Sequence, residues 1–162
     1  MIAVADTDIL SMFGKVKSVN ILKTLFKEIY VPTAVYEELL RVREIGFSFV
    51  DEILADLEVL SLSSEEHEEY TAFLRNEKYL HKGEAQSIII CKHRKGILLT
   101  NDKHAKEFCR KNGIVYFDIK GILRALFLKG IVKENELRKL AAEIEDKDNT
   151  TIKDFEKIFE KS

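Results

Sequence analysis

The sequence is poor in cysteine and lacks any long apolar run. Cys91 and Cys109 are its two cysteines, and both fall in segments with helical periodicity. They provide no disulfide framework and indicate a reducing compartment. Residues 1–30 lack a basic start followed by a long apolar core, and no stretch reaches the roughly 18 apolar residues of a membrane span. We therefore expect a soluble, cytoplasmic protein without a membrane partner, folded as one domain over residues 1–162.

An overall excess of either charge is also absent. The formal net charge is -2, which argues against a protein that coats nucleic acid nonspecifically. Two local excesses lie within this average: residues 44–69 contain acids but no lysine or arginine, whereas residues 92–111 are mainly basic. The basic segment is a candidate contact for phosphates, with a solvated helix face as the alternative. Its candidate nucleic-acid-binding residues are Lys92, Arg94, Lys95, Lys103 and Lys106.

Short apolar runs alternate along the chain with segments of helical period. The apolar runs predict strands at about 2–5, 28–31, 57–62, 97–100 and 114–117. Helices are expected at about 7–13, 18–26, 33–44, 47–55, 64–76, 84–95, 103–112, 119–129, 134–145 and 150–160. Ser63 followed by Glu66 is typical of a capping box, and the single proline, Pro32, marks a turn into a helix. This alternation predicts an α/β fold with a parallel sheet covered by helices on both faces.

Isolated acids stand at the ends of predicted strands. Asp6 follows the first strand in "IAVADTDIL", and Asp102 follows the fourth in "ILLTNDKHA". Parallel α/β sheets bind ligands outside the carboxyl ends of their strands, and neighbouring strands lie about 4.8 Å apart. If these strands are neighbours, the two carboxylates share a crevice. Asp6, Asp102 and also Asp118, after the fifth strand, are equally suited to cap the next helix, so this alternative stays open.

Two glutamates fall on apolar faces of predicted helices. In "TAVYEELLRV" the buried stripe is defined by Val35, Leu39 and Val42. Glu38 lies on that stripe, and Glu84 lies on an apolar line at the start of the helix in "HKGEAQSIIICK". An unpaired carboxylate turned toward a core costs several kcal/mol, so it requires a cation or a proton. The alternatives are a glutamate head that reaches solvent and stabilisation by the helix dipole.

Carboxylates gathered in one crevice require a counter-ion. At 4 Å each like-charge pair costs about 4 kcal/mol at an effective dielectric of 20. A divalent cation removes this conflict, and because the candidate ligands are all oxygens we expect one or two Mg²⁺ or Mn²⁺ ions. The predicted catalytic and metal-binding residues are Asp6, Glu38, Glu84 and Asp102.

Three stretches resemble, in order, the acid motifs of a PIN domain, the nuclease fold of VapC-type ribonuclease toxins and related proteins. They are "AVADTDIL", "VPTAVYEEL" and "KGEAQSIIICKHRKGILLTNDKHAKEFC". The resemblance covers roughly residues 1–130 and implies a three-layer fold whose central sheet has the order 3-2-1-4-5. The C-terminal helices at about 134–160, expected from periodicity, lie beyond it. It implies the same four acids as the site, with Thr7 and Thr100 as supporting hydroxyls. Many members have Ser or Asn in place of Asp8, which is therefore expected to be a supporting acid or an extra ligand, and Asp118 is a further supporting candidate.

The resemblance implies a metal-dependent endoribonuclease that hydrolyses phosphodiester bonds of single-stranded or structured RNA. In such sites the metal activates a water for in-line attack on phosphorus, with no covalent intermediate. It also implies the toxin of a toxin-antitoxin pair, with RNA as substrate and an antitoxin protein as partner. A homodimer is expected if residues 119–131, or the stripe of Ile152, Phe155 and Phe159, form an interface; core packing is the alternative.

Two other functions fit parts of the pattern. Haloacid-dehalogenase-like phosphatases end their first strand with Asp-x-Asp, here Asp6 as nucleophile and Asp8 as general acid or base. Thr33 and Asp102 would assist, but the usual glycine after the second acid is Ile9, and the two glutamates would have no role. The third hypothesis is a non-catalytic PIN-like module that binds RNA or a protein.

Overall fold

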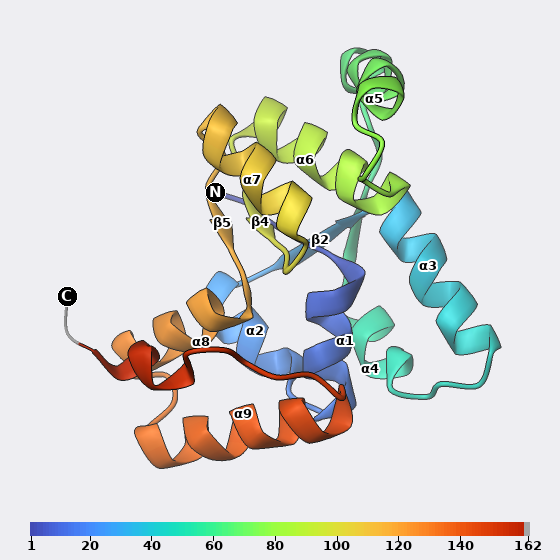
Figure 1. Ribbon diagram of the computed structural model, residues 1–162. Coiled ribbons are helices and arrows are strands. Elements are labelled where there is room, and N and C mark those ends of the chain that lie inside the picture. Colours follow the sequence, from blue (N-terminus) through green and yellow to red (C-terminus); the bar gives the residue numbers. More distant parts are fainter. Residues whose placement is uncertain (161–162) are drawn as a thin grey trace.

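The computed structural model describes residues 1–160 and contains a five-stranded, all-parallel sheet (Figure 1). Its strands are β1 (Ala3–Ala5), β2 (Ile29–Pro32), β3 (Glu58–Leu60), β4 (Ile97–Leu99) and β5 (Tyr116–Phe117). The strand order is β3-β2-β1-β4-β5, which confirms the predicted order. β1 is central and pairs with both β2 and β4, with Ala5 opposite Leu99. The strand order reverses beside β1, where parallel sheets open a ligand crevice.

Helices connect the strands and cover both faces of the sheet. They are α1 (Thr7–Lys15), α2 (Val19–Phe26), α3 (Thr33–Glu44), α4 (Val50–Ala55), α5 (Ser64–Asn76), α6 (Lys82–Arg94), α7 (Lys103–Asn112), α8 (Ile119–Leu128), α9 (Glu134–Lys147) and a 3₁₀ helix, η1 (Phe155–Phe159). The predicted α/β class and its helix layers are thus confirmed. Within residues 1–160, no helix combines the length and apolarity needed to cross a bilayer.

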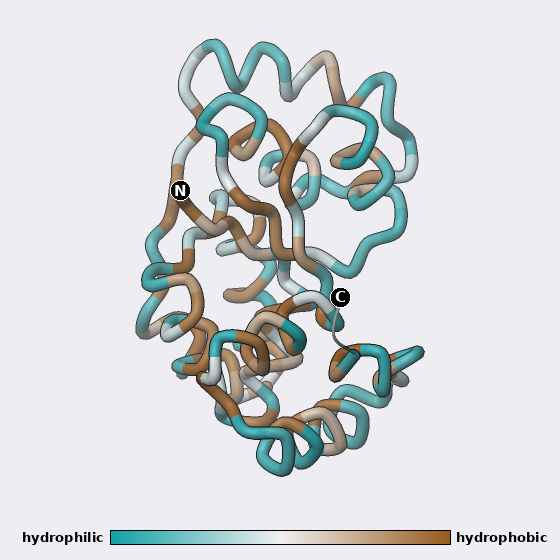
Figure 2. The backbone as a smooth tube through the Cα atoms, turned by 90° about the vertical axis from the view of Figure 1, so that its left-hand side faces the viewer, coloured by the Kyte–Doolittle hydropathy of each residue, from teal (hydrophilic) through white to brown (hydrophobic). Residues whose placement is uncertain are grey.

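The alternation of side chains along β1 divides the core into two layers. Ala3 and Ala5 belong to the larger cluster, which includes Phe13 of α1 and Ile122 of α8. Val4 points to the other face, where α6 and α7 supply the packing partners. Figure 2 shows the apolar strands in the middle of the molecule, with hydrophilic segments concentrated around them.

The predicted helix over 150–160 is wrong in its first half. Asn149 and Asp154 adopt left-handed backbone conformations, with φ of 52° and 55°, which a continuous α-helix does not permit. The chain between them is neither helix nor strand, and the Ile152 amide donates a hydrogen bond to Glu145 Oε2 at 3.0 Å. Only the short η1 follows.

The C-terminal apolar stripe packs within the chain. Ile152 and Ile158 are buried, and the ring of Phe159 lies edge-on to that of Phe127 in α8, with centroids 5.0 Å apart. Ile122, Leu123 and Leu126 of α8 belong to the same core. Most apolar side chains of these stretches therefore pack in the core, although Leu128 of α8 is 60% exposed. The homodimer stays a prediction.

Candidate active site

A cleft of about 350 Å³ lies at the carboxyl ends of β1 and β4. Two of its acids follow strands in the sequence: Asp6 comes directly after β1 and Asp102 shortly after β4. The other two belong to helices, Glu38 to α3 and Glu84 to the first turn of α6. All four acids predicted from the sequence therefore line one cleft, although they come from distant parts of the chain. The complete lining is Asp6, Thr7, Asp8, Glu38, His81, Gly83, Glu84 and Asp102.

Asp6 is the most deeply buried of these acids, with 6% of its surface exposed. It stands at the N-cap position of α1, but its side chain makes no capping hydrogen bond. Thr100 Oγ1 donates to Asp6 Oδ2 at 2.5 Å. Burial raises the pKa of Asp6 to about 8 despite this bond, and the neighbouring charge of Glu84 adds to the rise. Helix capping therefore does not account for this carboxylate.

Glu38 is held in position by contacts between α1, α3 and α6. Thr7 Oγ1 donates to Glu38 Oε2 at 2.5 Å. The N-terminus of α3 has no side-chain cap of its own, and the Ala34 amide donates instead to Gln86 Oε1 of α6 at 3.0 Å. A Cβ atom at Gly83 would lie 2.9 Å from Val35 Cγ2 and 3.3 Å from Glu38 Oε1. Glycine at position 83 thus permits the close approach of α6 to Glu38.

Sequence analysis missed the structural roles of Gly83 and Gln86. Both lie in "KGEAQ", directly around Glu84. A glycine inside a helix costs roughly 0.5–1 kcal/mol relative to alanine, so its presence in the first turn of α6 was a usable indication of a close packing contact. The bond of Gln86 to α3 had no local indication in the sequence.

Glu84 and Asp102 each make a local helix-end hydrogen bond. The His81 amide donates to Glu84 Oε2 at 2.7 Å, and the Ala105 amide donates to Asp102 Oδ1 at 2.7 Å. Burial raises the pKa of Glu84, the His81 amide opposes the rise, and the charge of Asp102 adds to it. The capping alternative is therefore correct for Asp102, but the same carboxylate also lines the cleft. Capping and a role in the cleft are compatible.

The four carboxylates share the cleft without converging on one point. Among residues 1–160, no group of three or more His, Cys, Asp or Glu side chains is placed so that it could hold a metal ion. Each of the four accepts a hydrogen bond from a hydroxyl or a backbone amide instead. The donor set is nevertheless entirely oxygen, as hard divalent cations prefer, and no lysine or arginine lines this cleft in the described part of the chain. The residue types therefore fit Mg²⁺ or Mn²⁺.

Asp8 and Asp118 lie outside the centre of this arrangement. Asp8 is exposed and lines both the acid cleft and a neighbouring cleft of about 420 Å³. Asp118 lines only the second cleft, where it caps α8 by accepting from the Gly121 amide at 2.9 Å. It also pairs with Lys106, with Nζ and Oδ2 3.2 Å apart. Asp8 is thus at the rim of the acid cleft, and Asp118 has a structural role beside it.

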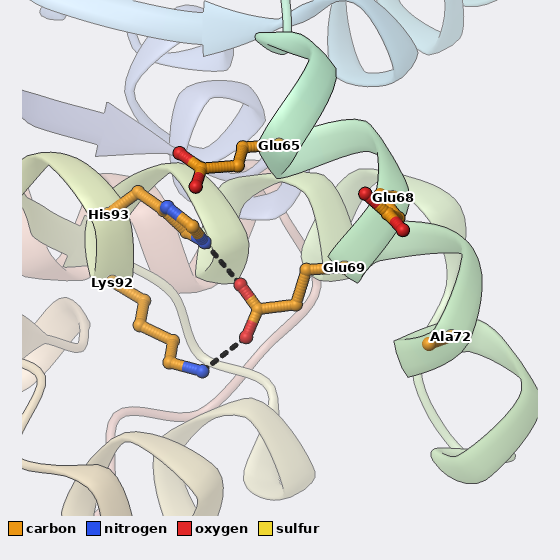
Figure 3. A pocket seen from close by; sticks show the side chains of 6 residues that line it. All are labelled: Glu65, Glu68, Glu69, Ala72, Lys92 and His93. Atoms are coloured by element: carbon orange, nitrogen blue, oxygen red, sulfur yellow. Dashed lines mark hydrogen bonds and ion pairs between the residues drawn. The ribbon is translucent and has the colours of Figure 1, made fainter.

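The basic residues predicted to bind nucleic acid divide into two groups. Lys92 and Arg94 lie eight and ten residues beyond Glu84, about 12–15 Å along α6. Figure 3 shows Lys92 and His93 approaching the carboxylate of Glu69 from the same helix, and both pair with it. Arg94 pairs with Glu66 at 2.7 Å. These ion pairs join α5 to the C-terminal end of α6, which is remote from Glu84 and the acid cleft.

The second group, Lys103 and Lys106, lies near the acid cleft and the neighbouring cleft. Lys103 is exposed and follows Asp102 directly at the start of α7, and Lys106 lines the second cleft beside Asp118. Lys95, in contrast, is the exposed residue at the C-terminal end of α6. The structure therefore places Lys103 and Lys106, but not Lys92, Arg94 or Lys95, next to the two clefts.

An all-parallel sheet with acids gathered at the carboxyl ends of its central strands defines an α/β protein whose site lies at the reversal of strand order. A family model described as the PIN domain matches residues 2–156. The chain therefore belongs to the PIN domain family, which has a nuclease-type fold. The match extends past residue 130, where the resemblance seen in the sequence ended, and includes α9. No curated protein matches the chain.

Proposed function

We propose that this protein is a metal-dependent endoribonuclease whose site consists of Asp6, Glu38, Glu84 and Asp102. The observation that carries the proposal is the buried carboxylate of Asp6, which caps no helix and has further acids as neighbours. The ionised form of such a carboxylate is costly unless a cation compensates its charge, and the raised pKa of Asp6 reflects this cost in the metal-free protein. The nuclease-type fold of the family supports the class of reaction.

The residues of the chain supply binding and positioning. Asp6, Glu84 and Asp102 present carboxylate oxygens to the cleft, and Thr7 and Thr100 hold Glu38 and Asp6 through their hydroxyls. A bound Mg²⁺ or Mn²⁺ would lower the pKa of a water and stabilise charge on the scissile phosphate. Lys103 is exposed beside Asp102 and would contact the RNA backbone. The toxin role, antitoxin partner and homodimer implied by the resemblance stay predictions.

The test compares two adjacent glutamates of α3. Glu38 lines the cleft, whereas Glu37 is exposed. Wild type, Glu38→Gln and Glu37→Gln are incubated with a mixed pool of single-stranded RNA and Mg²⁺, Mn²⁺ or EDTA. We expect cleavage by wild type and Glu37→Gln with a divalent ion, no cleavage in EDTA, and a loss of roughly 100-fold or more in Glu38→Gln.

Each alternative predicts a different result. Equal cleavage in EDTA would refute metal dependence. A phosphatase that uses Asp6 and Asp8 would be nearly insensitive to Glu38→Gln and would act on phosphomonoesters. RNA binding without cleavage under every ionic condition would identify a non-catalytic module.

A further inference from the structure

Beside the acid cleft the molecule carries an exposed pair of stacked rings. Tyr79 lies in the loop between α5 and α6, and His104 lies in the first turn of α7. Their ring centroids are 4.8 Å apart, and the ring planes differ by 16°. Tyr79 is 73% exposed. The histidine therefore covers part of the tyrosine ring, while most of that ring faces solvent.

Burial does not explain Tyr79 at this position. Large aromatic side chains stabilise a fold mainly through the apolar area that they remove from water, and an exposure of 73% leaves little of that gain. A flat, presented ring is instead what proteins use to stack an unpaired nucleotide base. One face of the ring is stacked on His104, so the other face is available to a base.

Both rings lie close in sequence to residues that line the cleft. Tyr79 is two residues from His81, and His104 is two residues from Asp102; His81 and Asp102 line the cleft. Two residues span at most about 7 Å of backbone. Lys103, which is exposed, lies between Asp102 and His104. A strand whose phosphate lies in the cleft would thus have a base within reach of the rings and a backbone phosphate within reach of a lysine.

We propose that Tyr79 and His104 form a stacking platform that binds an unpaired base of RNA next to the acid cleft. This inference rests on the proposed nuclease function and adds a base-binding site beside the cleft to it. A base in a duplex is stacked and paired with its neighbours, so it is not available to the platform. The platform therefore selects single-stranded RNA, or an unpaired loop, over a duplex.

The test measures binding separately from cleavage. In an Asp6→Asn background, which prevents cleavage under the proposed function, a single-stranded oligoribonucleotide of about twelve residues that contains 2-aminopurine is titrated with protein. We expect stacking to quench its fluorescence. Tyr79→Ala should weaken binding roughly 5- to 150-fold and remove the quench, and Tyr79→Phe should recover most of both. His104→Ala provides a second variant, with the same direction of effect.

The matched control is Phe47→Ala, because Phe47 is also an exposed aromatic, at 53%, but belongs to the segment between α3 and α4 and does not line the cleft. We expect Phe47→Ala to bind like the parent, and the fully paired duplex to bind weakly and equally to all variants. Unchanged affinity and quench in both Tyr79→Ala and His104→Ala would overturn the platform. If the wild-type enzyme still cleaves RNA in that case, the proposed function stands; absence of both binding and cleavage refutes both.

Discussion

Asp6 is the residue at which stability and the proposed function conflict. Its pKa rises from 3.8 to about 8 in the folded protein, chiefly through burial. At pH values between these two, Asp6 holds a proton in the folded protein that it has released in the unfolded chain. Folding stability therefore falls as the pH rises through this window, because the unfolded state binds fewer protons there than the folded state. This contribution is fully present below about pH 4 and is lost above about pH 8.

We predict that Asp6→Asn stabilises the metal-free protein at pH 8. Asparagine retains the shape of the side chain and removes the buried charge, and we expect a gain of about 1–3 kcal/mol in the free energy of unfolding. Urea denaturation in EDTA at pH 5 and pH 8 measures the difference. Wild type should lose more stability between the two pH values than Asp6→Asn, with Glu37→Gln behaving like wild type. Parallel pH profiles for wild type and Asp6→Asn would show that Asp6 is not the titrating group.

The sequence revealed the acids because each of them departs from a local rule. Asp6 and Asp102 follow buried strands, and Glu38 lies on the apolar stripe of α3. Tyr79 departs from no such rule, since a tyrosine in a polar loop is ordinary. Its contact with His104, 25 positions further along the sequence, exists only in the folded molecule. Residues defined by tertiary contacts were therefore beyond the reach of periodicity.

At the scale of elements, local chemistry predicted the helices that have clear start signals and failed for the segment after α9. The Ser63–Glu66 capping box is present and starts α5, and α3 has the predicted bounds. The error at 150–160 came from treating the spacing of Ile152, Phe155 and Phe159 as helical. Those side chains do share a buried surface, but a chain with left-handed residues can place them there without an α-helix. Periodicity predicted which residues are buried, not the backbone that buries them.

The contact between α3 and α6 makes a prediction about Gly83. Alanine has the higher helix propensity, by about 1 kcal/mol, so on local grounds Gly83→Ala should stabilise α6. The added Cβ would instead lie 2.9 Å from buried Val35, and overpacking of this kind costs typically 1–3 kcal/mol. We expect a net loss of about 1–2 kcal/mol in chemical denaturation, together with reduced cleavage, because Glu38 lies on the same side of the contact.

Lys82→Ala is the control for this experiment. Lys82 is exposed in the same helical turn, so its replacement should change stability by no more than about 0.5 kcal/mol. A Gly83→Ala protein that is more stable than wild type and fully active would mean that α6 can move away from α3 without displacing Glu38.

At the scale of the whole molecule, the two opposite charge excesses of the sequence meet across α5 and α6. Arg94 lowers the pKa of Glu66 to about 2 through their hydrogen bonds, and Lys92 pairs with Glu69. The sequence separations are 28 and 23 residues, too long for the helical i,i+4 pattern to reveal. Two side chains of the basic segment that indicated a phosphate-binding surface, Lys92 and Arg94, thus neutralise acids of the acidic segment before it.

The exposed lysines that remain provide a test of where RNA binds. Lys103 adjoins Asp102 at the acid cleft, whereas Lys95 ends α6 on the side remote from Glu84; both are exposed. In the Asp6→Asn background we predict that Lys103→Gln weakens the binding of single-stranded RNA, and that Lys95→Gln leaves it unchanged. Glutamine retains most of the side-chain length while removing one charge, so the comparison isolates electrostatics. The dependence of log K on log salt should become shallower by about 0.7 in Lys103→Gln, which corresponds to one phosphate contact.

The same change in Lys95→Gln would place the RNA along the full length of α6, and a change in Lys95→Gln alone would place the RNA-binding surface away from the carboxylates.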